Sequence, residues 1–175
     1  RDRDVSEQEA KLKLRLAQLE KHERCQEDFL IFVKNMWPDF IVGRHHKIIA
    51  EKLERVARGE LKRLIINMAP RHTKSEFASF LFPAWMMGRN PKMKIIQATH
   101  TTELAVNFGR KTKNLIDSDD YKDIFPSVNL SADSKASGRW DTTSGGMYYA
   151  VGVGSNLAGR GGDLVIIDDP HSEQT

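Results

Sequence analysis

Lys74 and Ser75 follow a short apolar run over residues 64–68 and open a helical pattern. In a loop between a strand and a helix, successive backbone N–H groups can surround a phosphate, and the helix directs its positive end at the same anion. A lysine there reaches the β- and γ-phosphates, and a serine hydroxyl ligates Mg²⁺. We therefore expect this segment to bind the phosphates of ATP. Its residues are Met68, Ala69, Pro70, Arg71, His72, Thr73, Lys74 and Ser75.

Two positions of this loop depart from the common phosphate-loop pattern. Met68 and Thr73 stand where that pattern has glycine. Glycine is favoured there because it accepts positive φ angles and lets the backbone approach the phosphate closely. An ordinary strand–loop–helix junction is therefore the competing interpretation of this segment taken alone.

A pair of carboxylates ends an apolar run near the other end of the chain. The run covers residues 164–167 and is followed by Asp168 and Asp169. In an open α/β sheet, a buried parallel strand delivers its C-terminal residues to the crevice where ligands bind. Asp168 would hold Mg²⁺ beside Ser75, and Asp169 would orient or deprotonate the attacking water, although glutamate is usual at that second position. A cap or turn is the alternative for the acids alone, but the two motifs in this order together favour an ATPase core.

The apolar periodicity predicts the elements that must position these groups. Expected helices cover residues 6–24, 26–37, 45–57, 75–87 and 102–117. Expected strands cover residues 64–68, 93–98, 138–143, 147–153 and 164–167, with 138–153 as a hairpin and 154–162 as a loop. Strands that alternate with helices indicate an α/β fold with a mostly parallel sheet flanked by helices. We expect an N-terminal helical extension over residues 1–59 and a partial ATPase core over residues 60–175.

The overall composition is that of a globular, soluble protein. Of the 175 residues, 39% are hydrophobic and 29% are charged, which argues against a disordered chain. Cys25 is the single cysteine, so neither an intramolecular disulfide nor a cysteine metal cluster can form, and a reducing, cytosolic setting is the default. The apolar stretch over residues 77–87 is too short to span a bilayer. A net charge of +3 is compatible with a polyanionic partner.

The remaining histidines and the tryptophans favour structural roles. His100 and His171 have no second histidine or cysteine at metal-ligand spacing, so we expect structural placement for both. No basic–aromatic alternation surrounds the tryptophans, so we expect packing rather than base stacking for Trp37, Trp85 and Trp140.

The chain resembles the large terminase subunit of tailed bacteriophages, the ATPase that pumps DNA into a prohead. The resemblance rests on residues 70–76, 159–162 and 165–170 and extends from about Phe29 to the end. Terminases carry an arginine inside the phosphate loop, here Arg71, which other P-loop proteins usually lack. The resemblance implies a P-loop NTPase fold of the ASCE type with ATP and Mg²⁺ as cofactors.

The resemblance also implies roles for individual residues and for partners. Arg71 would contact the γ-phosphate, and Arg160 would be the arginine finger that acts on the ATP of a neighbouring subunit, with Arg139 as second choice. For either finger, surface solvation is the competing interpretation. Residues 45–47 lie about where the family has its adenine-sensing segment. The implied partners are double-stranded DNA, the portal, the small terminase subunit and further copies in a ring, all in the host cytoplasm and without a membrane.

Family members have parts that these 175 residues do not contain. A further strand, later in sequence than the acidic strand, inserts between it and the phosphate-loop strand, and a nuclease domain follows. We therefore expect an incomplete sheet in a truncated or split large subunit, with weak ATP binding and no nuclease activity in the isolated chain.

Two other functions stay open. A helicase-like P-loop translocase would carry the same two motifs, with its own motifs further along. A non-catalytic module that binds nucleotide, or a partner through the charged N-terminal helix, is favoured by the departures at Met68, Thr73 and Asp169.

Overall fold

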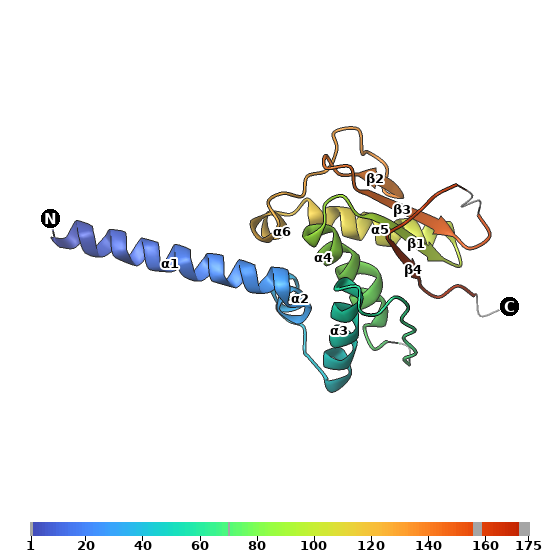
Figure 1. The fold of residues 1–175 in the computed structure, drawn as a ribbon, viewed down its shortest axis with the longest axis horizontal. Coiled ribbons are helices and arrows are strands. Elements are labelled where there is room, and N and C mark those ends of the chain that lie inside the picture. Colours follow the sequence, from blue (N-terminus) through green and yellow to red (C-terminus); the bar gives the residue numbers. More distant parts are fainter. Residues whose placement is uncertain (1, 70, 156–158, 172–175) are drawn as a thin grey trace.

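The computed structural model describes residues 2–69, 71–155 and 159–171. Its helical elements are α1 (Asp2–Glu27), α2 (Phe29–Met36), α3 (Arg44–Ala57), the π-helical segment η1 (Glu76–Leu81), α4 (Phe82–Arg89), α5 (Thr102–Ile116) and α6 (Asp119–Ile124). Its strands are β1 (Lys94–Thr99), β2 (Arg139–Asp141), β3 (Met147–Gly152) and β4 (Leu164–Ile167). The chain thus folds as an α/β protein with one four-stranded mixed sheet (Figure 1).

The sheet has the order β2-β3-β1-β4, with β1 in an inner position. Strand β1 pairs in parallel with both β3 and β4, while β2 and β3 form the predicted antiparallel hairpin. All residues of β1 after Lys94 are buried, because the strand has neighbours on both edges and side chains on both faces. The α/β class and the mostly parallel pairing are confirmed.

Helices pack on one face of the sheet and share its core. Ile95 and Tyr148 point from the sheet into a cluster that also contains Phe29 of α2, Phe77 of η1 and Trp85 of α4. The ring centroids of Phe29 and Phe77 lie 5.4 Å apart in an edge-to-face pair, a geometry worth about 0.5–1.5 kcal/mol beyond area burial. The expected burial of Trp85 and Trp140 is confirmed. Residues of the N-terminal helices and of the sheet therefore stabilise each other.

The other face of the sheet carries a smaller apolar cluster made by strands alone. It joins Ile96 and Ala98 of β1 to Val151 of β3, with Tyr149 against them. The parallel register places Val165 beside Ile96 on this face. The side chain of Val165 is 54% exposed, so this face is open at its β4 end.

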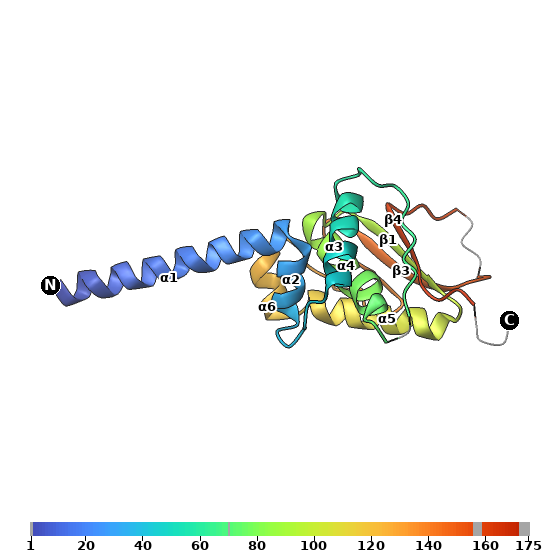
Figure 2. The same ribbon diagram turned by 90° about the horizontal axis from the view of Figure 1, so that it is seen from below.

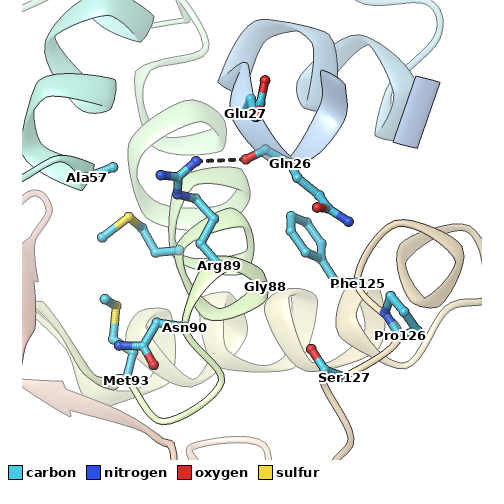
Figure 3. A pocket seen from close by; sticks show the side chains of 11 residues that line it. Gln26, Glu27, Ala57, Gly88, Arg89, Asn90, Met93, Phe125, Pro126 and Ser127 are labelled. Atoms are coloured by element: carbon cyan, nitrogen blue, oxygen red, sulfur yellow. Dashed lines mark hydrogen bonds between the residues drawn. The ribbon is translucent and has the colours of Figure 1, made fainter. Parts of the chain in front are cut away.

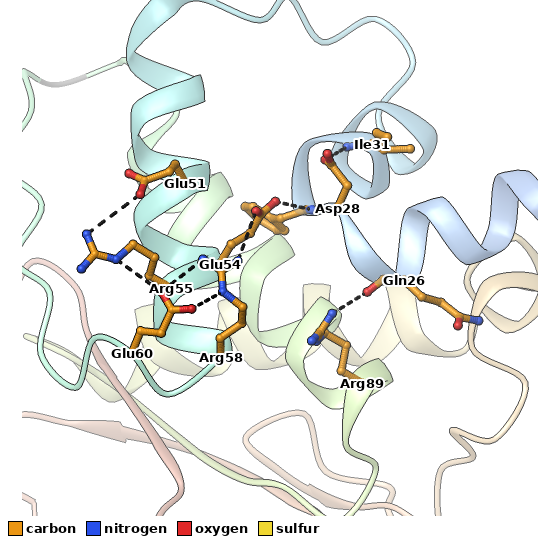
Figure 4. A network of polar contacts seen from close by, with 10 residues as sticks. Gln26, Asp28, Ile31, Glu51, Glu54, Arg55, Arg58, Glu60 and Arg89 are labelled. Atoms are coloured by element: carbon orange, nitrogen blue, oxygen red, sulfur yellow. Dashed lines mark hydrogen bonds and ion pairs between the residues drawn. The ribbon is translucent and has the colours of Figure 1, made fainter.

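A capping aspartate divides the first two helices. The Asp28 carboxylate accepts a hydrogen bond from the backbone N–H of Ile31 at 2.9 Å, which is the arrangement of a helix N-cap. The predicted start of the second helix at Gln26 is therefore wrong, since the helix begins only after this cap. The Phe29 N–H donates to Glu54 of α3, and Arg89 of α4 donates to the Gln26 carbonyl (Figure 4). These contacts join the end of α1 to the body.

Helix α1 extends away from the rest of the molecule (Figures 1 and 2). The side chains from residue 5 to residue 21 are all exposed, including Leu12, Leu16 and Leu19. Contacts with α2, α4 and α6 involve its C-terminal end. Over the described part of the chain, no helix combines the length and apolar character needed to cross a membrane.

Two of the predicted strands differ from the structure. Residues 64–68 form no strand, although Leu64 and Ile66 pack against the core and Ile65 between them is 86% exposed. The alternation of a strand is present, but no neighbouring strand in the described ranges bonds to this segment. Strand β4 forms as predicted but is not buried, because it pairs with β1 on one edge only and Ile167 remains 64% exposed.

Candidate functional site

Backbone strain marks both predicted motifs. Arg71 and Thr73 adopt φ angles of 64° and 60°, and Asp169 adopts 48°. Within residues 2–69, 71–155 and 159–171, they are the non-glycine residues with positive φ. Such conformations are costly for residues with a Cβ and persist where the surroundings enforce them, often at functional sites. All three fall in the two segments that the sequence singled out.

The fold brings the two motifs together at Lys74 and Asp168. The Lys74 ammonium nitrogen lies 3.9 Å from Oδ1 of Asp168. Helical backbone begins at Lys74, so the free N–H groups of the first turn lie at the same place. At 3.9 Å the pair is too long for a hydrogen bond. The lysine is therefore attracted by the carboxylate without being fixed to it.

Ser79 also contacts the buried carboxylate, and sequence reasoning missed it. Its hydroxyl donates to Oδ2 of Asp168 at 2.8 Å, and both residues are buried. Ser79 lies in η1, where the backbone is wider than an α-helix and the Phe82 N–H bonds to the Phe77 carbonyl. Such π-helical turns are rare and frequent at functional sites. The available signal was a lone hydroxyl in a helix that is otherwise almost entirely apolar.

Asp168 and Ser75 carry oxygen ligands of the kind that Mg²⁺ prefers. This ion takes one or two protein oxygens and completes its shell with water and substrate phosphates. Ser79 occupies Oδ2 of Asp168, and Oδ1 faces the lysine and the loop. The Ser75 side chain makes no helix-capping hydrogen bond. No cluster of three or more His, Cys, Asp or Glu side chains suited to a metal lies in the part of the chain that the structure describes.

The turn after β4 is fastened by His100. Both the backbone N–H and ring Nδ1 of His100 lie 3.1 Å from the Asp169 carbonyl oxygen, so Nδ1 carries the proton. The Asp169 side chain is exposed. His100 thus contacts the backbone of this turn, and His171 is exposed.

His46 and Thr73 connect α3 to the loop. The Gly43 N–H donates to Nδ1 of His46 at 2.8 Å, so the other ring nitrogen, Nε2, carries the hydrogen and donates to the Thr73 hydroxyl at 2.7 Å. That hydroxyl donates in turn to the His72 carbonyl at 2.6 Å. Burial lowers the pKa of His46, and the adjacent His45 lowers it further, so the ring is neutral at pH 7.

The remaining described residues of the loop are Met68, Ala69, Arg71 and His72. Met68 packs against the main core, which accounts for an apolar residue where glycine was expected. The Ala69 carbonyl lies 3.2 Å from Nδ1 of His72, and the Arg71 side chain is exposed. Pro70 lies outside the described residues.

Both candidate arginine fingers lie beside Tyr149 of β3. The Arg160 guanidinium carbon is 4.2 Å from the centre of the Tyr149 ring, a cation–π contact. Arg139 of β2 is the register partner of Tyr149 in β3. Among the described residues, neither arginine forms an ion pair with Asp168. The two arginines belong to the helix-free face of the sheet.

A cavity of about 590 Å³ lies at the other end of α4 from the loop (Figure 3). Gly88, Asn90 and Phe125 contribute to its wall, and Arg89 projects into it. The guanidinium of Arg89 already donates to the Gln26 carbonyl and covers the Trp85 ring. This cavity is therefore separate from the candidate site.

Comparisons of the chain with models of protein families, with curated proteins and with solved structures found no match. The candidate site therefore rests on its own geometry. Its parts are a strained loop, a helix that begins at Lys74, and a buried carboxylate held by Ser79.

Proposed function

We propose that this chain is the ATP-binding part of a P-loop motor ATPase of the terminase large-subunit kind, which couples ATP hydrolysis to movement of double-stranded DNA. The approach of Lys74 to Asp168, from segments far apart in sequence, carries this proposal. A lysine at the start of a helix and a buried acid at the end of a parallel strand are the pair that phosphate and Mg²⁺ binding require.

Each group has a defined task in phosphoryl transfer. The N–H groups of the loop and the first helical turn bind phosphate oxygens, and Lys74 neutralises charge on the β- and γ-phosphates. Ser75 and Asp168 would hold Mg²⁺, which would supply further positive charge when bound. Asp169 orients the attacking water, and Arg71 adds a cation at the γ-phosphate. Catalysis of this reaction is mainly positioning and electrostatic stabilisation, so a preorganised loop suits it.

The remaining parts of the proposal concern neighbours. Arg160, with Arg139 as the alternative, acts on the ATP of an adjacent copy in a ring. The exposure of both arginines on the helix-free face of the sheet supports a role outside their own site. A further strand would lie between β4 and residues 64–68. The open edge of β4 and the lack of strand pairing at residues 64–68, among the described residues, support this position. The portal and the small terminase subunit complete the proposed assembly.

Substitution of Lys74 tests the proposal. In the full-length protein, Lys74→Ala should weaken Mg·ATP binding by about tenfold or more, because a charge-assisted contact contributes about 1.5–3 kcal/mol. Hydrolysis should fall with it. The matched control is Lys92→Ala, which removes an exposed lysine at the turn before β1 and should leave binding within about twofold. If the parent binds but does not hydrolyse ATP, the non-catalytic binding module replaces this proposal.

A further inference from the structure

Thr73 has a backbone conformation that its own side chain opposes. Its φ of 60° lies in the left-handed region. A β-branched residue is a clear outlier there, and the penalty for an L-residue reduces the population of that conformation by about tenfold or more. Glycine at this position would adopt the same angle without cost. Some other contact must therefore hold Thr73.

The hydrogen bonds of His46 provide that contact. The His46 ring donates to the Thr73 hydroxyl, which donates onward to the carbonyl of His72. The Thr73 carbonyl is also fixed, because it accepts from the Phe77 N–H at 3.0 Å. Both the side chain and the backbone of Thr73 are thereby held in one orientation.

His46 is itself rigid, so it can act as an anchor. Only 6% of the residue is exposed. Its ring lies between Phe40, at a centroid distance of 4.6 Å, and Phe77, at 5.2 Å in a stacked arrangement. The Gly43 N–H fixes the tautomer. A buried, packed ring with one defined donor gives a directional contact to the loop.

We infer that His46 is a positioning residue for the phosphate loop, which it holds through the Thr73 hydroxyl in the shape that glycine gives to other such loops. The inference rests on the proposed function and deepens it, because the ligand that profits is the polyphosphate of a nucleotide. The loop N–H groups then face the anion before it binds, and no ordering cost falls on the binding step. His46 need not touch the nucleotide itself.

A double-mutant cycle separates this role from a general packing role. His46→Phe keeps a ring between the two phenylalanines and removes both hydrogen bonds, and we expect it to weaken Mg·ATP binding about tenfold in the parent background. In the Thr73→Gly background the same substitution should change binding by less than about twofold, because glycine needs no anchor. Ile48→Phe is the matched control, since it adds the same ring to α3 at a residue that is 53% exposed and takes no part in the contact of His46 with Thr73, and it should leave binding within about twofold.

A second measurement does not depend on nucleotide. Amide hydrogen exchange of Phe77, whose N–H bonds to the Thr73 carbonyl, should be about tenfold faster in His46→Phe than in the parent and unchanged in Ile48→Phe. His46→Gln, which retains an amide donor, should restore part of the protection. Should His46→Phe fail to fold, Thr73→Val removes the hydroxyl with His46 intact and should weaken binding to the same extent.

The outcomes distinguish the two levels of the proposal. Absence of Mg·ATP binding by the parent would refute the proposed function, while the exchange measurement still tests the contact of His46 with Thr73. Equal loss of binding in both backgrounds would overturn the inference, because His46 would then act by a route other than Thr73. An unchanged exchange rate at Phe77 would overturn it as well.

Discussion

At the scale of single residues, the two oxygens of Asp168 have different neighbours. Oδ2 accepts a buried hydrogen bond from Ser79, and Oδ1 lies 3.9 Å from the ammonium group of Lys74. The hydroxyl fixes the rotation of the carboxylate, so that one oxygen stays directed toward the loop. A carboxylate held in this way is preorganised for a cation.

Removal of the Ser79 hydroxyl should expose this dependence. We expect Ser79→Ala to lower the free energy of unfolding by about 1–3 kcal/mol, because a buried carboxylate oxygen loses its donor. We also expect the Mg²⁺ concentration for half-maximal nucleotide binding to rise by about threefold to tenfold, since loss of an outer-shell partner weakens metal affinity. Denaturant unfolding and magnesium titrations measure the two effects. Ser6→Ala, on exposed α1, is the control, and an unchanged magnesium requirement in Ser79→Ala would contradict the role.

The loop and the acidic pair could be predicted from sequence because they are local patterns. Residue type and spacing alone single out Lys74, Ser75 and Asp168 as candidate site residues. Ser79 and His46 could not be predicted in the same way. The first depends on the wider turn of η1, and the second depends on the packing of α3 against the loop. Their roles arise from tertiary geometry that no local pattern contains.

At the scale of elements, apolar periodicity predicted which helices and strands exist better than it predicted their boundaries or how the strands pair. The helix at α5 and the hairpin β2–β3 follow the pattern closely. The short helix α6 was missed, because its six residues begin with acids and carry little apolar periodicity. Residues 64–68 keep strand-like alternation without strand bonds, because alternation specifies which side is buried and not which partner is present.

Helix α1 should melt before the body of the protein. Over residues 5–21 it gains stability from local bonds and from weak pairs such as Lys11 with Glu7, and such helices are marginal in water. We expect far-UV circular dichroism to lose part of its helical signal at temperatures where tryptophan fluorescence is unchanged. Leu16→Gly should enlarge this early loss and leave the later transition in place, since glycine costs about 1 kcal/mol in an exposed helix.

The same change from leucine to glycine in a packed helix should have a different effect from Leu16→Gly in α1. Leu53 is 4% exposed in α3, so Leu53→Gly should lower the midpoint of the cooperative transition. Coincident melting by both signals in the parent protein would contradict the independence of α1.

At the scale of the whole molecule, the sheet has one covered and one open face. Helices pack against Ile95 and Tyr148, but Val165 and Ile167 are more than half exposed at the free edge of β4. An apolar edge strand with unpaired N–H and C=O groups is a template for association. This edge is therefore open to contact with another strand.

A charge at the edge should reduce that contact. We expect Val165→Lys to lower the tendency of the protein to associate at high concentration, with a stability change within about 0.5 kcal/mol because the site is exposed. Sedimentation velocity over a concentration series measures this. Ile41→Lys adds the same charge at a residue that is 85% exposed away from the sheet and should have no such effect. Equal association of both variants and the parent would contradict the assignment of the edge.

The junction between α1 and α2 at Asp28 determines how far the free end of α1 can move. Helix α1 has 26 residues, and at a rise of 1.5 Å per residue it reaches about 39 Å from the joint. A rotation of about 10° there would displace the far tip by about 7 Å, while the Phe29 and Glu54 side of the joint would shift far less. A small shift of α3 at this junction would therefore produce a large displacement at the far end of α1, and α3 also carries His46, which contacts Thr73 of the candidate loop.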